Sequence, residues 1–345
     1  MRVLSVVGNR PQFIKSAPLS AALRDAGIEE TVVHTGQHYD RELSQVFFDE
    51  LGLAAPRNLD LRTADVAEMA PRLEAAIHEA APDAVLVFGD TNSTLAGARA
   101  ADAAGLRVAH VEAGLRSGDL SMPEEHNRIE VDRIAAVLFC PDERSAETLR
   151  GEGVSGRIEV VGDVMADANR IFLPVARGRA PAAAKPYAVL TLHRQANTEP
   201  EQLRRLVAAV NETGWTFVFP VHRRTRDVLD THEIPLAPAV HATDPLGYLE
   251  MLDLVAGAAR VVTDSGGLQK EAYWARVPCI TLRPSTEWVD TVTVGANTLI
   301  DPADPSGLAA ALDDARFPEG APPLYGDGHA SEKVAAALLA SLGRS

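Results

Sequence analysis

Cysteine is scarce in this chain. Of 345 residues only two are cysteines, Cys140 and Cys279, and each lies in a short apolar run. A buried thiol that packs as a small hydrophobic group is the simplest interpretation of both. Neither belongs to a C-x-x-C pair, so the sequence supports neither a zinc site nor a redox site. We therefore expect no bound metal and no disulfide.

Long hydrophobic runs are also missing. No stretch approaches the roughly 18 apolar residues that a membrane-spanning helix needs. The opening segment MRVLSVVG is a short apolar run that ends in a glycine, which is typical of a first strand and not of a signal peptide. We expect a cytoplasmic protein that does not enter a membrane.

Positive charge is the third shortage. The chain has 33 Lys and Arg against 48 Asp and Glu, which gives a formal charge of -15. Nucleic acids and anionic membranes require basic surfaces, so both are disfavoured as partners. A small phosphate-bearing ligand remains compatible, because a few cations and helix N-termini inside a cleft are enough to bind it.

Short apolar runs alternate with stretches of helical length along the whole chain. This alternation predicts an α/β fold with parallel strands joined by helices, and the length favours two domains. A Pro-, Ala- and Arg-rich stretch at 173–186 lacks periodicity and predicts a linker. We therefore expect an N-terminal domain over 1–172 and a C-terminal domain over 187–328. The predicted strands are Arg2 to Val7, Thr31 to His34, Ala84 to Phe88, Arg107 to Val111, Ala136 to Cys140, Arg157 to Val161, Tyr187 to Leu192, Thr216 to Pro220, Arg260 to Thr263, Cys279 to Leu282 and Asn297 to Ile300.

The first motif, GNRPQFIK, follows the first predicted strand and leads into a helix. Ligands of open α/β sheets bind at the carboxyl ends of strands, so Arg10 and Lys15 place two cations where a phosphate or an oxyanion would lie. The alternative interpretation is that Arg10 and Lys15 are solvated surface charges. No G-x-G-x-x-G motif is present, which disfavours NAD and leaves no predicted cofactor.

Carboxylates follow the next strands of the first half. Asp90 comes after one apolar strand, either as a helix cap or as a ligand-facing group. Glu112 directly follows another strand, and Glu124 and Glu125 stand just before a predicted helix. Several carboxylates that converge on one crevice suit proton abstraction and return, provided that burial or like charge raises a pKa toward neutrality.

In the second half, His193 and His222 lie where two predicted strands end, either facing a ligand or as satisfied structural histidines. The segment VVTDSGGLQKEA is the clearest local signal. Its strand meets Ser265, Gly266 and Gly267 before a helix, which predicts a phosphate site at the helix N-terminus. Glu271, on the first turns of that helix, suits the hydroxyls of a ribose.

Taken together, these motifs resemble the non-hydrolysing UDP-N-acetylglucosamine 2-epimerase family. The similarity runs over nearly the whole chain, through GNRPQFIK, HTGQHYD, VFGDTNSTLAG, HVEAGLRSGD, MPEEHNR, LTLHR, PVH, DSGGLQKEA and YGDG in that order. The resemblance implies a GT-B architecture, with two Rossmann-like domains whose parallel sheets face a deep cleft. It also implies that a last helix, 329–345, packs back on the first domain, and that the protein is a homodimer.

The resemblance further implies a mechanism for a UDP-N-acetylhexosamine substrate. A base removes the proton at sugar carbon 2, UDP leaves anti to it, and UDP adds back to the resulting 2-acetamidoglucal after protonation of the opposite face. The implied acid/base carboxylates are Asp90, Glu112 and Glu124, with His193 near the leaving phosphate. The implied binding residues are Arg10, Lys15, Gln37, His38, His222, Leu246, Met251, Ser265, Gly266, Gly267 and Glu271, of which Glu271 binds ribose and the segment from Leu246 to Met251 borders uracil.

The sequence departs from this family at several points. The segment LDLRTADVAEM lacks the glycine-glutamine loop that, with Gln37 and His38, holds an activating second nucleotide sugar in many members, and Ala196 replaces a usual acidic residue. The TEW and QKEAYW segments place the chain in a branch that includes epimerases of a diacetamido glucuronic acid nucleotide. Such a modified substrate, a hydrolysing epimerase, a GT-B glycosyltransferase and a non-catalytic nucleotide-sugar sensor therefore remain alternatives.

Overall fold

The computed structural model describes residues 1–37, 56–120, 122–181 and 184–342. The chain divides into two compact units. The first combines Met1–Ile171 with Tyr325–Ser345, and the second consists of Phe172–Leu324. Within the described ranges, no helix combines the length and the hydrophobicity needed to cross a bilayer.

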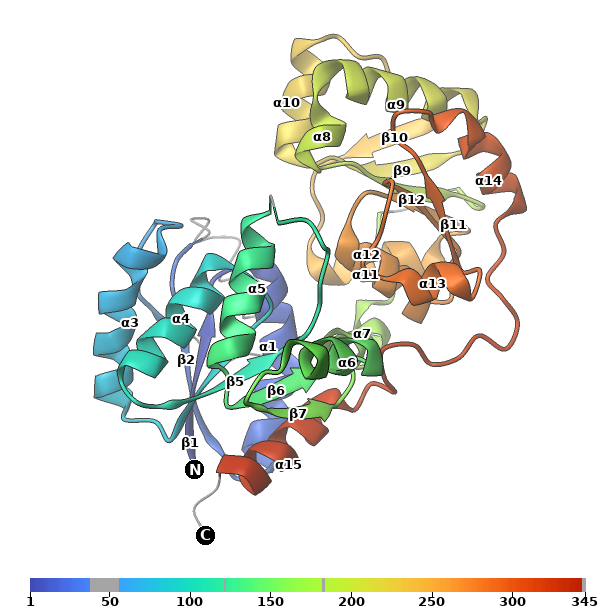
Figure 1. Ribbon diagram of the computed structural model, residues 1–345. Helices are drawn as coiled ribbons and strands as arrows, with labels where there is room; N and C mark the ends of the chain where they lie inside the picture. The colour runs from blue at the N-terminus through green and yellow to red at the C-terminus, as the bar shows by residue number, and fades with distance from the viewer. Residues whose placement is uncertain (38–55, 121, 182–183, 343–345) are drawn as a thin grey trace. The chain divides into compact units, whose positions relative to one another are not determined.

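The first unit is built on one sheet of seven parallel strands in the order β3-β2-β1-β4-β5-β6-β7 (Figure 1). The helices α3, α4 and α5 lie on one face of the sheet, and α1 and α15 lie on the other. The strands are β1 (Arg2–Val7), β2 (Glu29–His34), β3 (Arg57–Asn58), β4 (Ala84–Phe88), β5 (Arg107–Val111), β6 (Val137–Cys140) and β7 (Arg157–Val160). The helices are α1 (Arg10–Asp25), α3 (Val66–Ala80), α4 (Asn92–Ala103), α5 (Pro123–Ile134), α6 (Glu143–Glu152), α7 (Val164–Ala176) and α15 (Ala330–Leu342).

The second unit contains six parallel strands in the order β10-β9-β8-β11-β12-β13. The strands are β8 (Ala188–Thr191), β9 (Phe217–Pro220), β10 (Val240–Thr243), β11 (Arg260–Thr263), β12 (Cys279–Leu282) and β13 (Asn297–Ile300). The helices are α8 (Gln195–Thr198), α9 (Pro200–Glu212), α10 (Arg223–Thr231), α11 (Tyr248–Gly257), α12 (Gly266–Trp274), α13 (Val289–Thr293), the 3-10 turn η1 (Pro305–Gly307) and α14 (Leu308–Asp314).

The central strands are apolar throughout because helices cover both faces of each sheet. In β4, all five residues of AVLVF are buried. In β8, Leu190 packs in one hydrophobic cluster and Val189 in another. Successive side chains of a strand point to opposite faces, so each central strand supplies residues to two cores.

In both sheets the strand order reverses beside the first strand of the unit, between β1 and β4 and between β8 and β11. The connections that follow these strands turn to opposite faces of the sheet, which leaves a crevice at the carboxyl ends of the strands. The loops after β4, β8 and β11 carry Asp90, His193 and Ser265, and the helix after β1 carries Arg10 and Lys15. The topology therefore places a candidate ligand site at this edge of each unit.

Two strands of the structure, β3 and β10, are absent from the sequence prediction. Both are edge strands with polar, exposed residues: both residues of β3 are exposed, and two of the four residues of β10 are exposed. An edge strand pairs on one side only, so it needs no apolar run. The predicted linker is also too long at its start, because α7 continues as far as Ala176.

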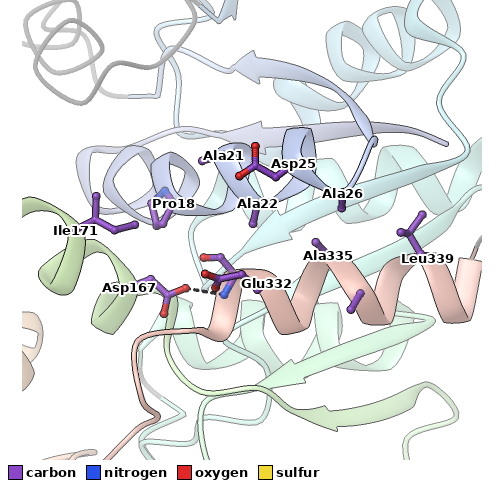
Figure 2. A pocket seen from close by; sticks show the side chains of 12 residues that line it. Pro18, Ala21, Ala22, Asp25, Ala26, Asp167, Ile171, Glu332, Ala335 and Leu339 are labelled. Carbon is purple, nitrogen blue, oxygen red and sulfur yellow. Dashed lines mark hydrogen bonds between the residues drawn. The ribbon is translucent and has the colours of Figure 1, made fainter.

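A buried carboxylate helps to fix the C-terminal helix α15 to the first unit. Asp167 on α7 accepts the backbone N–H groups of Ala330 (2.9 Å) and Ser331 (2.6 Å) at the start of α15. Beside this contact lies a groove of about 410 Å³ between α1, α7 and α15, lined largely by alanine and other apolar side chains (Figure 2). Asp167 therefore stabilises the helix N-terminus, as a negative charge does there.

We expect Asp167→Ala to loosen α15, because two buried N–H groups would lose their acceptor at a cost of about 1–3 kcal/mol each. Amide hydrogen exchange across Ala330–Leu342 should accelerate, and the free energy of unfolding in urea should fall. Asp102→Ala is the matched control, because Asp102 is an exposed aspartate on α4, away from α15. Unchanged protection of α15 in the Asp167 variant would contradict this role.

Candidate functional site

The loop after β1 is fixed to the end of β4 by Gln12. Its side-chain oxygen accepts the Gly8 N–H at 2.7 Å, and its amide nitrogen donates to the Phe88 carbonyl at 2.7 Å and to the Thr94 hydroxyl at 2.9 Å. Gly8 packs so closely against Ser93 that a Cβ at this position would collide with the serine side chain. The GNRPQFIK motif therefore serves to join two strand ends.

Asp90 lies directly after β4 and is not the cap of the following helix. Thr91 caps α4 by accepting the Thr94 N–H at 3.2 Å, which excludes the capping alternative for Asp90. The Asp90 carboxylate instead binds Arg128 of α5, with its Oδ2 2.6 Å from Nη2 and 2.9 Å from Nε. Asn127 donates to the Asp90 carbonyl at 2.9 Å. Two neighbouring residues of α5 thus fix this aspartate.

Glu112, after β5, forms an ion pair with Lys15 of α1. A Cβ placed on Gly89 would lie 3.5 Å from both Glu112 Oε2 and Lys15 Nζ, so this pair lies over the residue that precedes Asp90. Glu112 adopts φ +70°, a left-handed conformation that is rare outside glycine. Backbone strain of this kind clusters at functional sites, and here it accompanies a carboxylate at the crevice.

The two adjacent glutamates of α5 differ sharply. The sequence predicts both just before the helix, but both belong to its first turn. Glu125 is buried and accepts the N–H groups of Ser117 and Gly118 at 3.0 Å, and Arg128 at 2.7 Å. Glu124 is exposed, and within the described ranges no hydrogen bond or ion pair joins it to Asp90 or Glu112.

The electrostatic environments of Asp90 and Glu125 push their pKa values in opposite directions. Burial raises the pKa of Asp90; Arg128 and Lys15 oppose this rise, and the nearby Glu112 adds to it. Burial also acts on Glu125, but the Ser117 and Gly118 amides and Arg128 outweigh it and lower the pKa of that carboxyl. Asp90 is therefore the easier of the two to protonate, whereas Glu125 remains an anion that holds Arg128.

In the second unit, Asp264 organises the loop after β8. This fully buried carboxylate accepts the N–H groups of His193 and Arg194 at 3.0 Å, and its Oδ1 lies 3.1 Å from His193 Nδ1. Asn197 adds a further hydrogen bond at 3.2 Å. Because Nδ1 donates to Asp264, Nε2 is the ring nitrogen of the half-exposed His193 that is available to a ligand.

His222 lies beside His193, with the ring centroids 6.3 Å apart. It also caps α10, because its Nδ1 accepts the Arg224 N–H at 3.2 Å. Burial, followed by the charges of His193 and Arg224, lowers the pKa of His222. The cap gives His222 a structural role, which is one of the two roles that the sequence analysis proposed for it.

The predicted phosphate site at Ser265, Gly266 and Gly267 forms the start of α12, with Ser265 as the cap residue. A Cβ on Gly266 would come within 2.6 Å of the Glu287 carboxylate, which pairs with Arg283 at 2.9 Å. A side-chain anion therefore lies near this positive helix end. A Cβ on Gly267 would meet nothing within 4 Å, so the helix end is open on that side.

The remaining predicted binding residues lie as follows. Glu271 on α12 is half-buried and raises the pKa of the buried Tyr248 hydroxyl, with burial as the larger cause. Leu246 and Met251 pack against the hydrophobic cluster that α11 and α12 form with the sheet of the second unit. Gln37 accepts the Ser93 hydroxyl at 2.6 Å, Arg10 begins α1, and His38 lies outside the described residues.

Three residues that the sequence interpretation did not single out prove central to these contacts: Gln12, Arg128 and Asp264. Each stood inside a quoted motif, but a motif does not reveal which member pairs with a residue some 40 to 80 positions away. Among the described residues, no group of three His, Cys, Asp or Glu side chains is arranged to hold a metal ion.

Comparison with known proteins gives consistent results. A family model for UDP-N-acetylglucosamine 2-epimerase matches residues 21–339. A UDP-2,3-diacetamido-2,3-dideoxy-D-glucuronate 2-epimerase of Pseudomonas aeruginosa is 41% identical over 97% of this chain and 98% of its own. A UDP-N-acetylglucosamine 2-epimerase of Methanocaldococcus jannaschii is 38% identical over 87% of this chain and 88% of its own. The crystal structure of the M. jannaschii enzyme with UDP-GlcNAc and UDP superposes with a TM-score of 0.89, at 35% identity, over 99% of this chain and 100% of that one.

The buried Asp264 makes the stability of the second unit depend on pH. Burial alone would raise its pKa, but His193 and the amides of His193 and Arg194 outweigh burial and lower it. A lowered folded-state pKa means that the carboxylate stabilises the fold above the unfolded pKa of about 3.9, and that this contribution is lost as the pH falls through the folded-state value. Asp264→Asn should therefore cost about 1.5–3 kcal/mol of unfolding free energy at neutral pH.

The difference in unfolding free energy between Asp264→Asn and the unmodified chain should be smaller in the acid range than at neutral pH. Urea titrations at neutral pH and in the acid range measure it. The matched control is Asp244→Asn, an exposed aspartate of the same unit, which should unfold as the unmodified chain does at neutral pH. An equal loss at both pH values would show that the charge of Asp264 is not what stabilises the loop.

Proposed function

Because the chain belongs to the UDP-N-acetylglucosamine 2-epimerase family, we propose that it interconverts UDP-GlcNAc and UDP-ManNAc without hydrolysing them. The observation that carries the proposal is the pair of carboxylates, Asp90 and Glu112, held by cations at the ends of adjacent strands. Membership of the family makes the chain an isomerase; the substrate and the mechanism are the parts that we propose.

In the proposed reaction, a carboxylate removes the proton at carbon 2 while the bond from carbon 1 to the UDP oxygen breaks on the opposite side. The products are 2-acetamidoglucal and UDP, which stay bound. A second acid then delivers a proton to the other face of carbon 2, and the UDP oxygen attacks carbon 1. No electrons are exchanged with a cofactor, and each proton taken up is matched by one released.

Asp90 and Glu112 are the proposed proton-transfer groups. Each binds one cation, Arg128 or Lys15, and each follows a strand whose end lies at the crevice. The raised pKa of Asp90, caused mainly by burial, supports a role in accepting and releasing a proton. Glu124 is the third carboxylate of the proposal; its exposed position on α5 leaves it accessible to a ligand.

The second unit is proposed to bind UDP. His193, oriented by Asp264, presents Nε2 to the leaving phosphate, and the open Gly267 side of α12 receives the diphosphate. In the first unit, Arg10 and Lys15 are the cations proposed to bind charged groups of the ligand. Glu271 binds the ribose hydroxyls, and the segment from Leu246 to Met251 borders the uracil. Glu287 lies close to this phosphate site, so its pairing with Arg283 reduces the charge that the diphosphate would meet.

A modified sugar is the strongest alternative substrate. The relative from P. aeruginosa carries the name of a diacetamido-glucuronate nucleotide epimerase and covers almost the whole chain. A hydrolysing epimerase or a glycosyltransferase would use the same nucleotide site but would release UDP, to water or to an acceptor. A cytoplasmic homodimer remains a sequence prediction. Activation by a second nucleotide sugar is not part of the proposal, because the segment LDLRTADVAEM lacks the glycine-glutamine loop that would act with Gln37 and His38.

The reaction and the substrate can be tested in one experiment. The protein is incubated in heavy water with UDP-GlcNAc and, separately, with UDP-2,3-diacetamido-2,3-dideoxyglucuronate. We expect deuterium at carbon 2 and the manno epimer, without accumulation of free UDP. Exchange with the uronate alone would identify the alternative substrate, stoichiometric UDP release would indicate hydrolysis, and no exchange with any UDP-N-acetylhexosamine would eliminate the epimerase proposal.

Removal of either proton-transfer carboxylate should slow turnover and leave the fold intact. Asp90→Asn and Glu112→Gln keep the side-chain size, and each should lower kcat by roughly 100-fold or more, the scale of an acid-base contribution. Asp102→Asn on α4 and Glu74→Gln on α3 are matched controls, because both are exposed residues of the same unit. Epimerisation at the unmodified rate in both Asp90 and Glu112 variants would remove their assigned roles.

A further inference from the structure

His110 is a buried titratable residue to which the proposed mechanism gives no role. It lies on β5, two residues before Glu112, and its side chain is completely buried. Its Nδ1 lies 2.7 Å from Oδ1 of Asp132, and its Nε2 lies 2.7 Å from the carbonyl oxygen of Gly89. Both ring nitrogens therefore form short hydrogen bonds.

The partners of the ring define its protonation state. The Gly89 carbonyl has no proton to give, so Nε2 must donate. Asp132 receives the Gly114 N–H at 3.2 Å and the Arg116 guanidinium at 2.8 Å on its other oxygen. Burial alone would raise the pKa of Asp132, but its contacts with His110 and Arg116 outweigh burial and lower it. An ionised carboxylate only accepts, so Nδ1 must donate as well.

The hydrogen bond to Gly89 acts on the backbone next to Asp90. The Gly89 N–H donates to the Val111 carbonyl at 2.9 Å, while the Gly89 carbonyl accepts from His110. The peptide group that links Gly89 to Asp90 therefore cannot rotate without breaking the His110 bond. Gly89 adopts φ +62° and has no side chain of its own that could help to fix this turn.

The other side of the ring acts on α5. Asp132 lies four residues after Arg128, one helical turn further along α5. His110 therefore holds, through Asp132, the same helix that supplies the partner of Asp90. The backbone of Asp90 and the cation that binds its carboxylate are both positioned from one buried ring.

We propose that His110 donates a hydrogen bond from each ring nitrogen and is a positioning residue: it fixes the Gly89–Asp90 peptide and, through Asp132, the place of Arg128 relative to Asp90. Asp132 neutralises the charge of the His110 ring. His110 takes no part in proton transfer. The kinetic consequence of this inference rests on the proposed function, whereas the protonation state does not.

The protonation state can be measured directly. The chain is labelled with ¹⁵N-histidine, and the His110 signals are assigned by their loss in His110→Gln. We expect a proton on each ring nitrogen, as the two donated hydrogen bonds require. A ring with one protonated nitrogen would overturn the inference, whatever reaction the protein catalyses.

Two variants separate the two hydrogen bonds. An asparagine amide nitrogen lies near the place of Nδ1, and a glutamine amide nitrogen near that of Nε2. His110→Asn should therefore lose the Gly89 bond and reduce kcat by about 10- to 100-fold with KM unchanged, the scale of a misplaced catalytic group. His110→Gln keeps a donor for Gly89 and should recover much of that loss.

His78→Gln, an exposed substitution on α3, is the matched control and should keep the unmodified kcat. An unmodified kcat in His110→Asn would overturn the positioning role, and so would a change confined to KM. If His110→Asn does not fold, His110→Gln and the nitrogen signals of the unmodified chain still decide. Failure of the proposed function appears separately, as absence of carbon 2 exchange in the unmodified chain.

Discussion

The ion pair between Asp90 and Arg128 ties the end of β4 to α5, and the first half of the candidate site depends on it. Glu125 and Asp132, on either side of Arg128 along α5, are themselves fixed and hold the helix that carries it. Glu125 is held by the backbone of the loop after β5, and Asp132 by His110 and Arg116. Each anion in this network faces a donor, so the buried charges are compensated, as burial requires.

This arrangement divides the carboxylates of the first unit into two kinds. Glu125 and Asp132 have lowered pKa values and stay ionised, which makes them fixed anchors. Asp90 has a raised pKa, although it has an arginine partner, because burial and the nearby Glu112 disfavour its charge. A difference of this kind between neighbouring carboxylates separates structural anions from groups that exchange protons.

The second unit uses the same design with other residues. Asp264 follows β11 and binds the loop after β8, just as Gln12 after β1 binds the end of β4. In both units a side chain near one strand end fixes the backbone of an adjacent strand end where the strand order reverses. Groups for a ligand are thereby placed on rigid strand ends, and not on independent loops.

The sequence by itself determined the fold class and the family, and both are confirmed by the two parallel α/β sheets and by the comparisons. Buried parallel strands require apolar runs, which the sequence shows, and the motifs in their order carry the resemblance to the family. The edge strands β3 and β10 escaped prediction, since pairing on one side requires no such run.

Only the tertiary structure decided which polar residues meet. The sequence identified Asp90 but left its capping role open, and only the family resemblance distinguished Glu124 from Glu125. The structure assigned the cap to Thr91, buried Glu125 and exposed Glu124. The partners of Asp90, His110 and His193 lie some 20 to 70 residues away along the chain. Local pattern carries no information about such pairs, because strand order and helix packing alone bring them into contact.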